Sequence, residues 1–144
     1  MSLTTKIKSL TPYELIDAMI QGLKNPSCQI DMRSFGHEID GICFGCAATN
    51  AIQYLSGKKF TPDNIDGTYN RAEYLKLDKG VLNSFEFAID HLRCGSIYTA
   101  NIYLAELRIP EIIYDLDKEY PVLTTGNYLE NLHHYEELRD QQPH

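Results

Sequence analysis

Four cysteines have the clearest capacity for chemistry in this chain, and two of them, Cys43 and Cys46, are spaced C-x-x-C. The stretch that follows is rich in small residues and reads as a helix. The helical period places four side chains that can form hydrogen bonds on one face of that helix, which we call the polar stripe: Cys46, Thr49, Asn50 and Gln53. The sequence therefore predicts Cys46 as a candidate nucleophile, with Thr49, Asn50 and Gln53 as candidate binding residues.

Three kinds of chemistry fit these cysteines. Metal binding would need Cys28 and Cys94 to join the pair as thiolate ligands of zinc, although these two are isolated in the sequence. Redox chemistry of the thioredoxin type would need a strand before the motif, whereas residues 33–40 are predicted to be a polar loop. Nucleophilic catalysis would need a base beside Cys46, and the histidines on predicted helices are His91, His133 and His134.

The segment from Gly41 to Ala48, GICFGCAA, resembles the nucleophile motif of papain-like cysteine proteases, in which the second cysteine opens a helix and attacks the substrate carbonyl. The resemblance implies a hydrolase or transferase with Cys46 as its nucleophile. Ala47 stands in place of the family's tryptophan, and Asp40 in place of the glutamine that donates to the oxyanion. A carboxylate at that place would repel the developing negative charge.

The simplest interpretation treats all four cysteines as small buried hydrophobic side chains, as free cysteines usually are. Thr49 can then bond back to the carbonyl of Gly45, while Asn50 and Gln53 tie the helix to a neighbouring loop. We prefer this interpretation because it needs no ligand.

Helical periodicity and capping signals predict a mainly α fold: a single compact multi-helix domain over residues 1–140, with at most a minor short-strand component and a loose C-terminal tail at 141–144. The clearest signal is the capping box that begins at Thr11. Residues 96–109 are ambiguous between strand and helix, and helix is favoured. The other predicted helices span residues 12–24, 43–56, 70–77, 81–94, 110–118 and 127–140, with extended segments at 28–32 and 120–125.

Three segments, Cys43–Gln53, Arg71–Leu75 and Ala88–Gly95, together resemble a group of short uncharacterised cyanobacterial proteins. The likeness covers about the first two thirds of the chain. It implies a source and a family, but it implies no activity.

The 144-residue chain has a net charge of −7, and its longest basic run is Lys58-Lys59. Binding to nucleic acid or to an anionic membrane is not expected, because both need a basic face. No apolar run approaches the ~20 residues that cross a bilayer, and the N-terminus lacks the apolar segment of a secretory signal. We therefore expect a cytoplasmic protein whose cysteines are reduced thiols or metal ligands rather than disulfides.

The stretch from Ser96 to Tyr120 holds more apolar and aromatic residues than one helix needs, among them Tyr98, Tyr103, Tyr114, Tyr120, Ile102 and Ile112. They form either ordinary core or an exposed patch for a protein partner or a second copy. Because no complete catalytic set is visible, the leading prediction is a non-enzymatic protein–protein interaction or regulatory module, self-associating as a homo-oligomer and without a cofactor. The alternatives are a cysteine-dependent enzyme using Cys46 and a metal site formed by Cys28, Cys43, Cys46 and Cys94.

Overall fold

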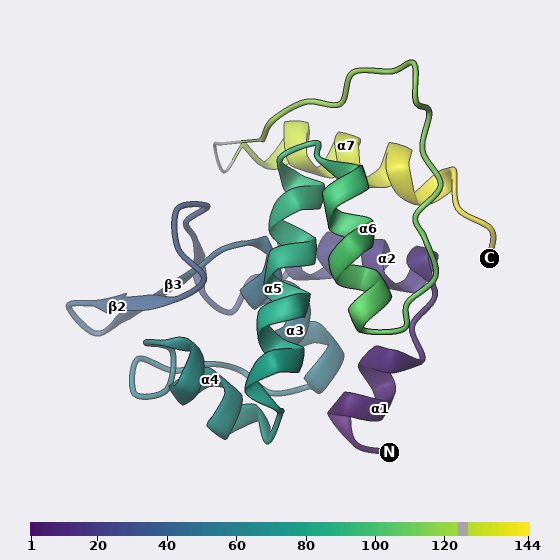
Figure 1. Ribbon diagram of the computed structural model, residues 1–144. Coiled ribbons are helices and arrows are strands. Elements are labelled where there is room, and N and C mark those ends of the chain that lie inside the picture. Colours follow the sequence, from purple (N-terminus) through teal and green to yellow (C-terminus); the bar gives the residue numbers. More distant parts are fainter. Residues whose placement is uncertain (124–126) are drawn as a thin grey trace.

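The computed structural model describes residues 1–123 and 127–144 as a mainly helical domain with one small mixed sheet (Figure 1). Helices make up 53% of the chain and strands 6%, so the predicted fold class is confirmed. The helices are α1 (Leu3–Lys8), α2 (Pro12–Lys24), α3 (Ala47–Ser56), α4 (Thr68–Leu75), α5 (Lys79–Arg93), α6 (Ile97–Glu106) and α7 (Tyr128–Asp140). The strands are β1 (Gln29–Ile30), β2 (His37–Ile39) and β3 (Ile42–Gly45).

Helices with strong local signals form where the sequence predicts them. In α2 the capping box is complete, because the Glu14 N–H donates to the Thr11 hydroxyl and the Thr11 N–H donates to the Glu14 carboxylate. Of the ambiguous residues 96–109, Ile97–Glu106 form α6, and Asn127 caps α7 through its side chain. The short helix α1 was not predicted, because its six residues carry little periodic signal.

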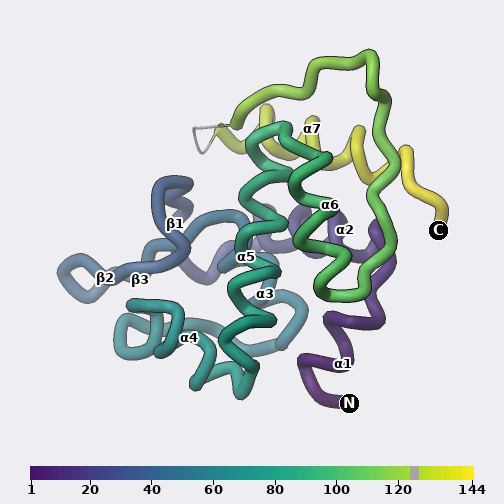
Figure 2. The backbone as a smooth tube through the Cα atoms, in the orientation of Figure 1, coloured from purple at the N-terminus to yellow at the C-terminus, as the bar shows by residue number. Residues whose placement is uncertain are grey.

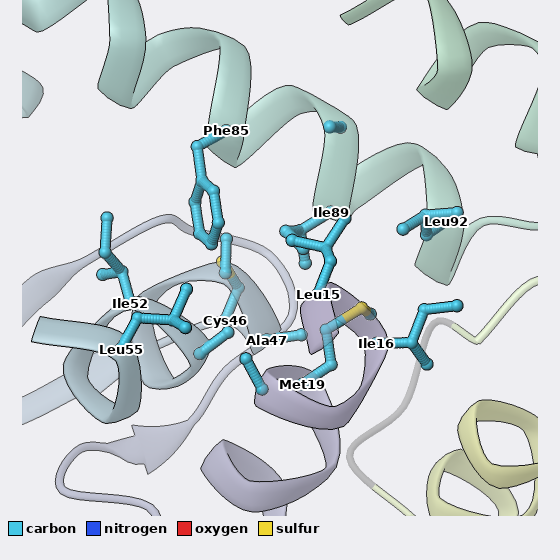
Figure 3. Close-up of a cluster of buried hydrophobic side chains, with 14 of the residues drawn as sticks. Leu15, Ile16, Met19, Cys46, Ala47, Ile52, Leu55, Phe85, Ile89 and Leu92 are labelled. Atoms are coloured by element: carbon cyan, nitrogen blue, oxygen red, sulfur yellow. The ribbon is translucent and has the colours of Figure 1, made fainter. Parts of the chain in front are cut away.

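The central element is α3, which packs between α2 and α5 (Figures 1 and 2). Its small residues Ala48 and Ala51 are fully buried, which lets the neighbouring helices approach its backbone closely. Figure 3 shows where the three helices meet, with side chains converging from α2, α3 and α5, among them Leu15, Met19, Ile52, Phe85 and Ile89. The hydrophobic core therefore surrounds the helix that carries the candidate site.

The backbones of α2 and α3 touch at Gly22. A Cβ at this position would lie 2.6 Å from the carbonyl carbon of Asn50 and 2.8 Å from the nitrogen of Ala51. Both neighbours are backbone atoms of a buried helix, so neither can move away cheaply. Only glycine permits this approach, which brings α2 against the middle of the polar stripe.

Replacing Gly22 with alanine should therefore lower the free energy of unfolding by about 2–3 kcal/mol, the usual cost of overpacking a tight contact. Urea denaturation measures the change. Gly57→Ala is the control, because Gly57 has open space around its Cβ position and a φ of +69°, so alanine there costs only the left-handed strain of about 1 kcal/mol. Equal losses in the two variants would contradict the close contact.

The C-x-x-C segment was predicted wrongly as the first turn of a helix. Residues Ile42–Gly45 form strand β3, which pairs parallel with β1 and antiparallel with β2, and α3 begins only after Cys46. The predicted loop 33–40 therefore contains β2. Asp40 and Gly41 form the two-residue turn between β2 and β3, both with positive φ, and this Asp-Gly pair is the hairpin signal that the sequence analysis did not use.

The helix predicted over residues 110–118 is also wrong. Residues 110–115 are extended and 116–118 form a turn. Two side-chain amides bond the extended backbone: Asn101 bonds both the N–H and the carbonyl of Ile112, and Gln142 does the same for Ile113. Ile112 is buried while Ile113 is exposed, which is the alternation of an extended chain. The tail at 141–144, predicted as loose, is thus anchored by the buried Gln142.

A buried ion pair connects α4 to α5. Arg71 donates to Glu86 at 2.9 Å, and both side chains are 3% exposed. Burial raises the pKa of Glu86 to about 7, although the charge and hydrogen bond of Arg71 oppose the rise. Because the folded-state pKa lies above its ordinary value of 4.5, the contribution of Glu86 to stability is full below that pH and is lost as the pH rises through about 7.

The variant Arg71→Met should lose about 3–5 kcal/mol of unfolding free energy at pH 8, because it leaves the Glu86 charge buried and alone. At pH 5 the loss should be smaller, since Glu86 can then take up a proton. Chemical denaturation at both pH values measures the difference. The double variant with Glu86→Leu should recover most of the loss, and an equal loss at pH 5 and pH 8 would contradict this account.

Candidate functional site

The polar stripe of α3 lies inside the protein rather than on its surface. Thr49, Asn50 and Gln53 are 1%, 2% and 5% exposed, and Cys46 is 4% exposed. The Thr49 hydroxyl donates to the backbone carbonyl of Phe35, and not to Gly45 as the sequence suggested. The stripe is therefore brought together as predicted, but it faces neighbouring chain segments.

Asn50 and Gln53 hold two other segments against α3. The Asn50 amide donates to the Cys46 carbonyl at 3.2 Å and accepts from the Cys28 N–H at 3.3 Å. Gln53 donates to the same Asn50 oxygen at 3.0 Å and accepts from the Phe60 N–H at 2.7 Å. These bonds occupy both amide oxygens, so the network serves to position the chain around α3.

Cys46 occupies the N-cap position of α3, beside a cavity of about 250 Å³. Burial raises the pKa of its thiol, although the backbone N–H groups of Thr49 and Ala48 lower it. A neutral buried thiol is a poor nucleophile at neutral pH. The walls of the cavity come from the loop after β1 and from α5: Met32, Arg33, Ser34, Phe35, Asp90 and Arg93.

The histidines considered as bases lie elsewhere. His91 stacks on Tyr103, and His134 packs against Tyr120 and Tyr135, where burial lowers its pKa. His133 is exposed on α7 beside Glu137. The cavity beside Cys46 is lined by no histidine in the described part of the chain, so the papain-like pairing of thiol and imidazole has no geometric support there.

Cys28 and Cys43 form a disulfide that joins the residue before β1 to β3. The prediction that all four cysteines are reduced or bind a metal is wrong for this pair. Sulfurs bonded to each other cannot be thiolate ligands, and within residues 1–123 and 127–144 no group of three or more metal-binding side chains gathers. Cys46 and Cys94 keep free thiols. Sequence spacing missed the pair because β1 and β3 become neighbours only in the folded sheet.

An apolar surface groove lies between α6 and the extended segment 109–116, which runs back beside that helix (Figure 1). Its two hollows measure about 350 and 460 Å³, and both are lined by Tyr98 and Glu111. We call this surface the α6 groove; its other lining residues include Ile102, Ala105, Ile109, Ile113 and Leu116. It is the part of the Ser96–Tyr120 stretch that the core leaves uncovered.

Four exposed side chains of the α6 groove are large and apolar, and they lie beside the exposed carboxylate of Glu111. Tyr98 is 71% exposed, Ile102 51%, Ile113 55% and Leu116 81%. Composition alone does not separate these residues from core, because their apolar neighbours Ile97, Ile109 and Ile112 are buried. For Ile113 and Leu116 the course of the segment after α6 decides which side chains face out, whereas Tyr98 and Ile102 lie on the exposed face of α6.

Comparison with protein-family models, curated proteins and solved structures finds no match to this chain. The resemblance to cyanobacterial proteins stays a prediction. In the described residues, no helix combines the length and apolar character that crossing a bilayer requires. The fold and the candidate sites define a small, mainly helical protein with a disulfide-linked sheet and an apolar groove.

Replacing Gln53 with alanine tests whether the stripe is structural. The variant leaves the buried Phe60 N–H without its acceptor, so we expect a loss of about 2–3 kcal/mol in unfolding free energy. Gln29→Ala, at an exposed position of β1, is the matched control and should change stability by less than about 0.5 kcal/mol. A Gln53→Ala protein as stable as the control would show that the network does not position the chain.

Proposed function

We propose that this protein is a non-enzymatic interaction module that self-associates through the α6 groove. The observation that carries the proposal is the set of exposed apolar side chains from Tyr98 to Leu116, which line adjoining hollows on one surface. Exposed apolar side chains that line adjoining hollows are typical of protein–protein interfaces.

A second copy is the proposed partner because the groove has both projections and hollows. Leu116 and Tyr98 project into solvent, while Ile102, Ala105 and Ile109 line the hollow beside them. A two-fold symmetric dimer needs one surface to supply both features, since the same patch faces itself. Burying these side chains would also remove apolar area from water, which is the main driving force of association.

The negative charge of the chain opposes this association, and its effect can be measured by varying the salt concentration. Each copy has a net charge of −7, and Glu106, Glu111 and Asp115 are exposed near the groove. Salt screens such repulsion over about 10 Å at 0.1 M. Self-association should therefore strengthen as the salt concentration rises. Binding of a basic partner would weaken instead, because salt also screens the attraction between opposite charges.

A cysteine-dependent enzyme remains the alternative prediction, and the burial and raised pKa of Cys46 speak against it. A metal site formed by the four cysteines would require the Cys28–Cys43 disulfide to be opened first. The cytoplasm stays the predicted location.

Replacing Ile102 with glutamate should disrupt the proposed dimer, because it places a charge in the apolar hollow. We expect the dissociation constant from sedimentation equilibrium to rise at least about tenfold, equivalent to ~1.4 kcal/mol. Ile39→Glu is the matched control: Ile39 is equally exposed, at 52%, but lies on β2, away from α6 (Figure 1). A wild-type protein that stays monomeric at every concentration, or an Ile39→Glu variant that dissociates as readily, would refute the proposal.

A further inference from the structure

We propose that the Cys28–Cys43 disulfide is a redox-sensitive clasp: while closed it holds the loop of residues 31–36 over Cys46, and its reduction opens the cavity and exposes the Cys46 thiol. This inference does not depend on self-association. It concerns the small sheet and the cavity beside Cys46, and it uses no residue of the α6 groove.

The clasp closes the chain segment that forms the small sheet. Its two cysteines are separated by 15 residues, and their Cα atoms are 4.9 Å apart. Within that segment lie β1, the loop and β2. A cross-link of this kind limits how far the enclosed chain can move away from the body of the protein.

The loop inside the clasp makes the wall over Cys46. Residues 32–35 line one side of the cavity beside Cys46, and Asp90 and Arg93 of α5 line the other. The carbonyl of Phe35 accepts a hydrogen bond from Thr49, one turn after Cys46. With the loop in this position Cys46 is only 4% exposed, so the position of the loop controls access to the thiol.

Apart from the disulfide, only noncovalent contacts hold the loop, among them the Thr49 bond to the Phe35 carbonyl and the edge contact of the Phe35 ring with Phe87. Strand β1 has only two residues, and the Asp31 N–H donates to the Gly45 carbonyl at 2.9 Å. Arg33 pairs with Asp31 of the same loop, and its side chain is 88% exposed. Short pairing of this kind opens locally at low cost, so the disulfide is the strongest single restraint on the loop.

One end of the clasp is also connected to Cys46 through Asn50. The Cys28 N–H donates to the Asn50 side-chain oxygen, and the nitrogen of the same amide donates to the Cys46 carbonyl. A shift of Cys28 after reduction would therefore disturb the start of α3, where Cys46 lies. This gives the two cysteine sites a physical connection that sequence spacing alone does not.

The opening reaction is a two-electron reduction by a dithiol. A thiolate of the dithiol attacks the Cys43 sulfur, because Cys43 is half-buried whereas Cys28 is 1% exposed. The sulfur–sulfur bond breaks, and Cys28 leaves as a thiolate that takes up a proton. The second thiolate of the reductant then attacks the reductant sulfur that is bonded to Cys43. Cys43 leaves as a thiolate and takes up a proton, and the reductant becomes a cyclic disulfide.

Cysteine alkylation of the 144-residue chain tests the proposal. The oxidised protein and protein reduced with dithiothreitol, then freed of reductant without oxygen, are pulsed with iodoacetamide, and peptide mass spectrometry follows each thiol. We expect Cys46 to react at least about tenfold faster in the reduced protein. Cys94, half-buried and outside the clasp, is the internal control and should change less than about twofold.

The double variant Cys28→Ser with Cys43→Ser provides a permanently open clasp without reductant, and it should label Cys46 as fast as the reduced protein does. Circular dichroism checks that the variant is folded. Equal alkylation rates of Cys46 with the clasp closed and open would overturn the proposal and would indicate that the disulfide has only a structural role. A parallel acceleration of Cys46 and Cys94 would overturn it too, because it would mean general unfolding.

Discussion

The close approach of α2 to α3 is the constraint on which the other features depend. Because position 22 has no side chain, the two helix backbones meet at Asn50 and Ala51, and α3 is enclosed between α2 and α5. A helix enclosed in this way cannot leave polar side chains unbonded. Asn50 and Gln53 therefore bond to the segments that pass them, at Cys28 and Phe60.

This packing changes the role that can be assigned to the polar side chains of α3. A thiol, a hydroxyl and two amides on one face of a helix are equally suited to a binding site and to a set of internal hydrogen bonds. Their burial, together with the occupied amide oxygens, favours the internal role for Thr49, Asn50 and Gln53. Cys46 differs from them, because it lies beside a cavity whose wall is a loop held by a disulfide.

The two proposals concern different parts of the molecule. Self-association rests on α6 and the extended segment beside it, where apolar side chains have no cover. The redox clasp rests on the small sheet, which pairs cysteines that are 15 residues apart. In a reducing compartment a disulfide is more often redox-responsive than permanent. A redox-responsive Cys28–Cys43 disulfide would therefore be compatible with the predicted cytoplasmic location.

The features that could be predicted from the sequence are those that depend on local interactions. The mainly helical class and the boundaries of α2 and α7 follow from caps and periodicity that act over one or two turns. For residues 97–106 only the helix propensity of individual residues favours a helix, because α6 has no side-chain cap. The tertiary structure decided the rest. Amides from Asn101 and Gln142 keep residues 112–113 extended, and β1 meets β3 only after folding, so the disulfide depends on pairing distant segments that no local propensity encodes.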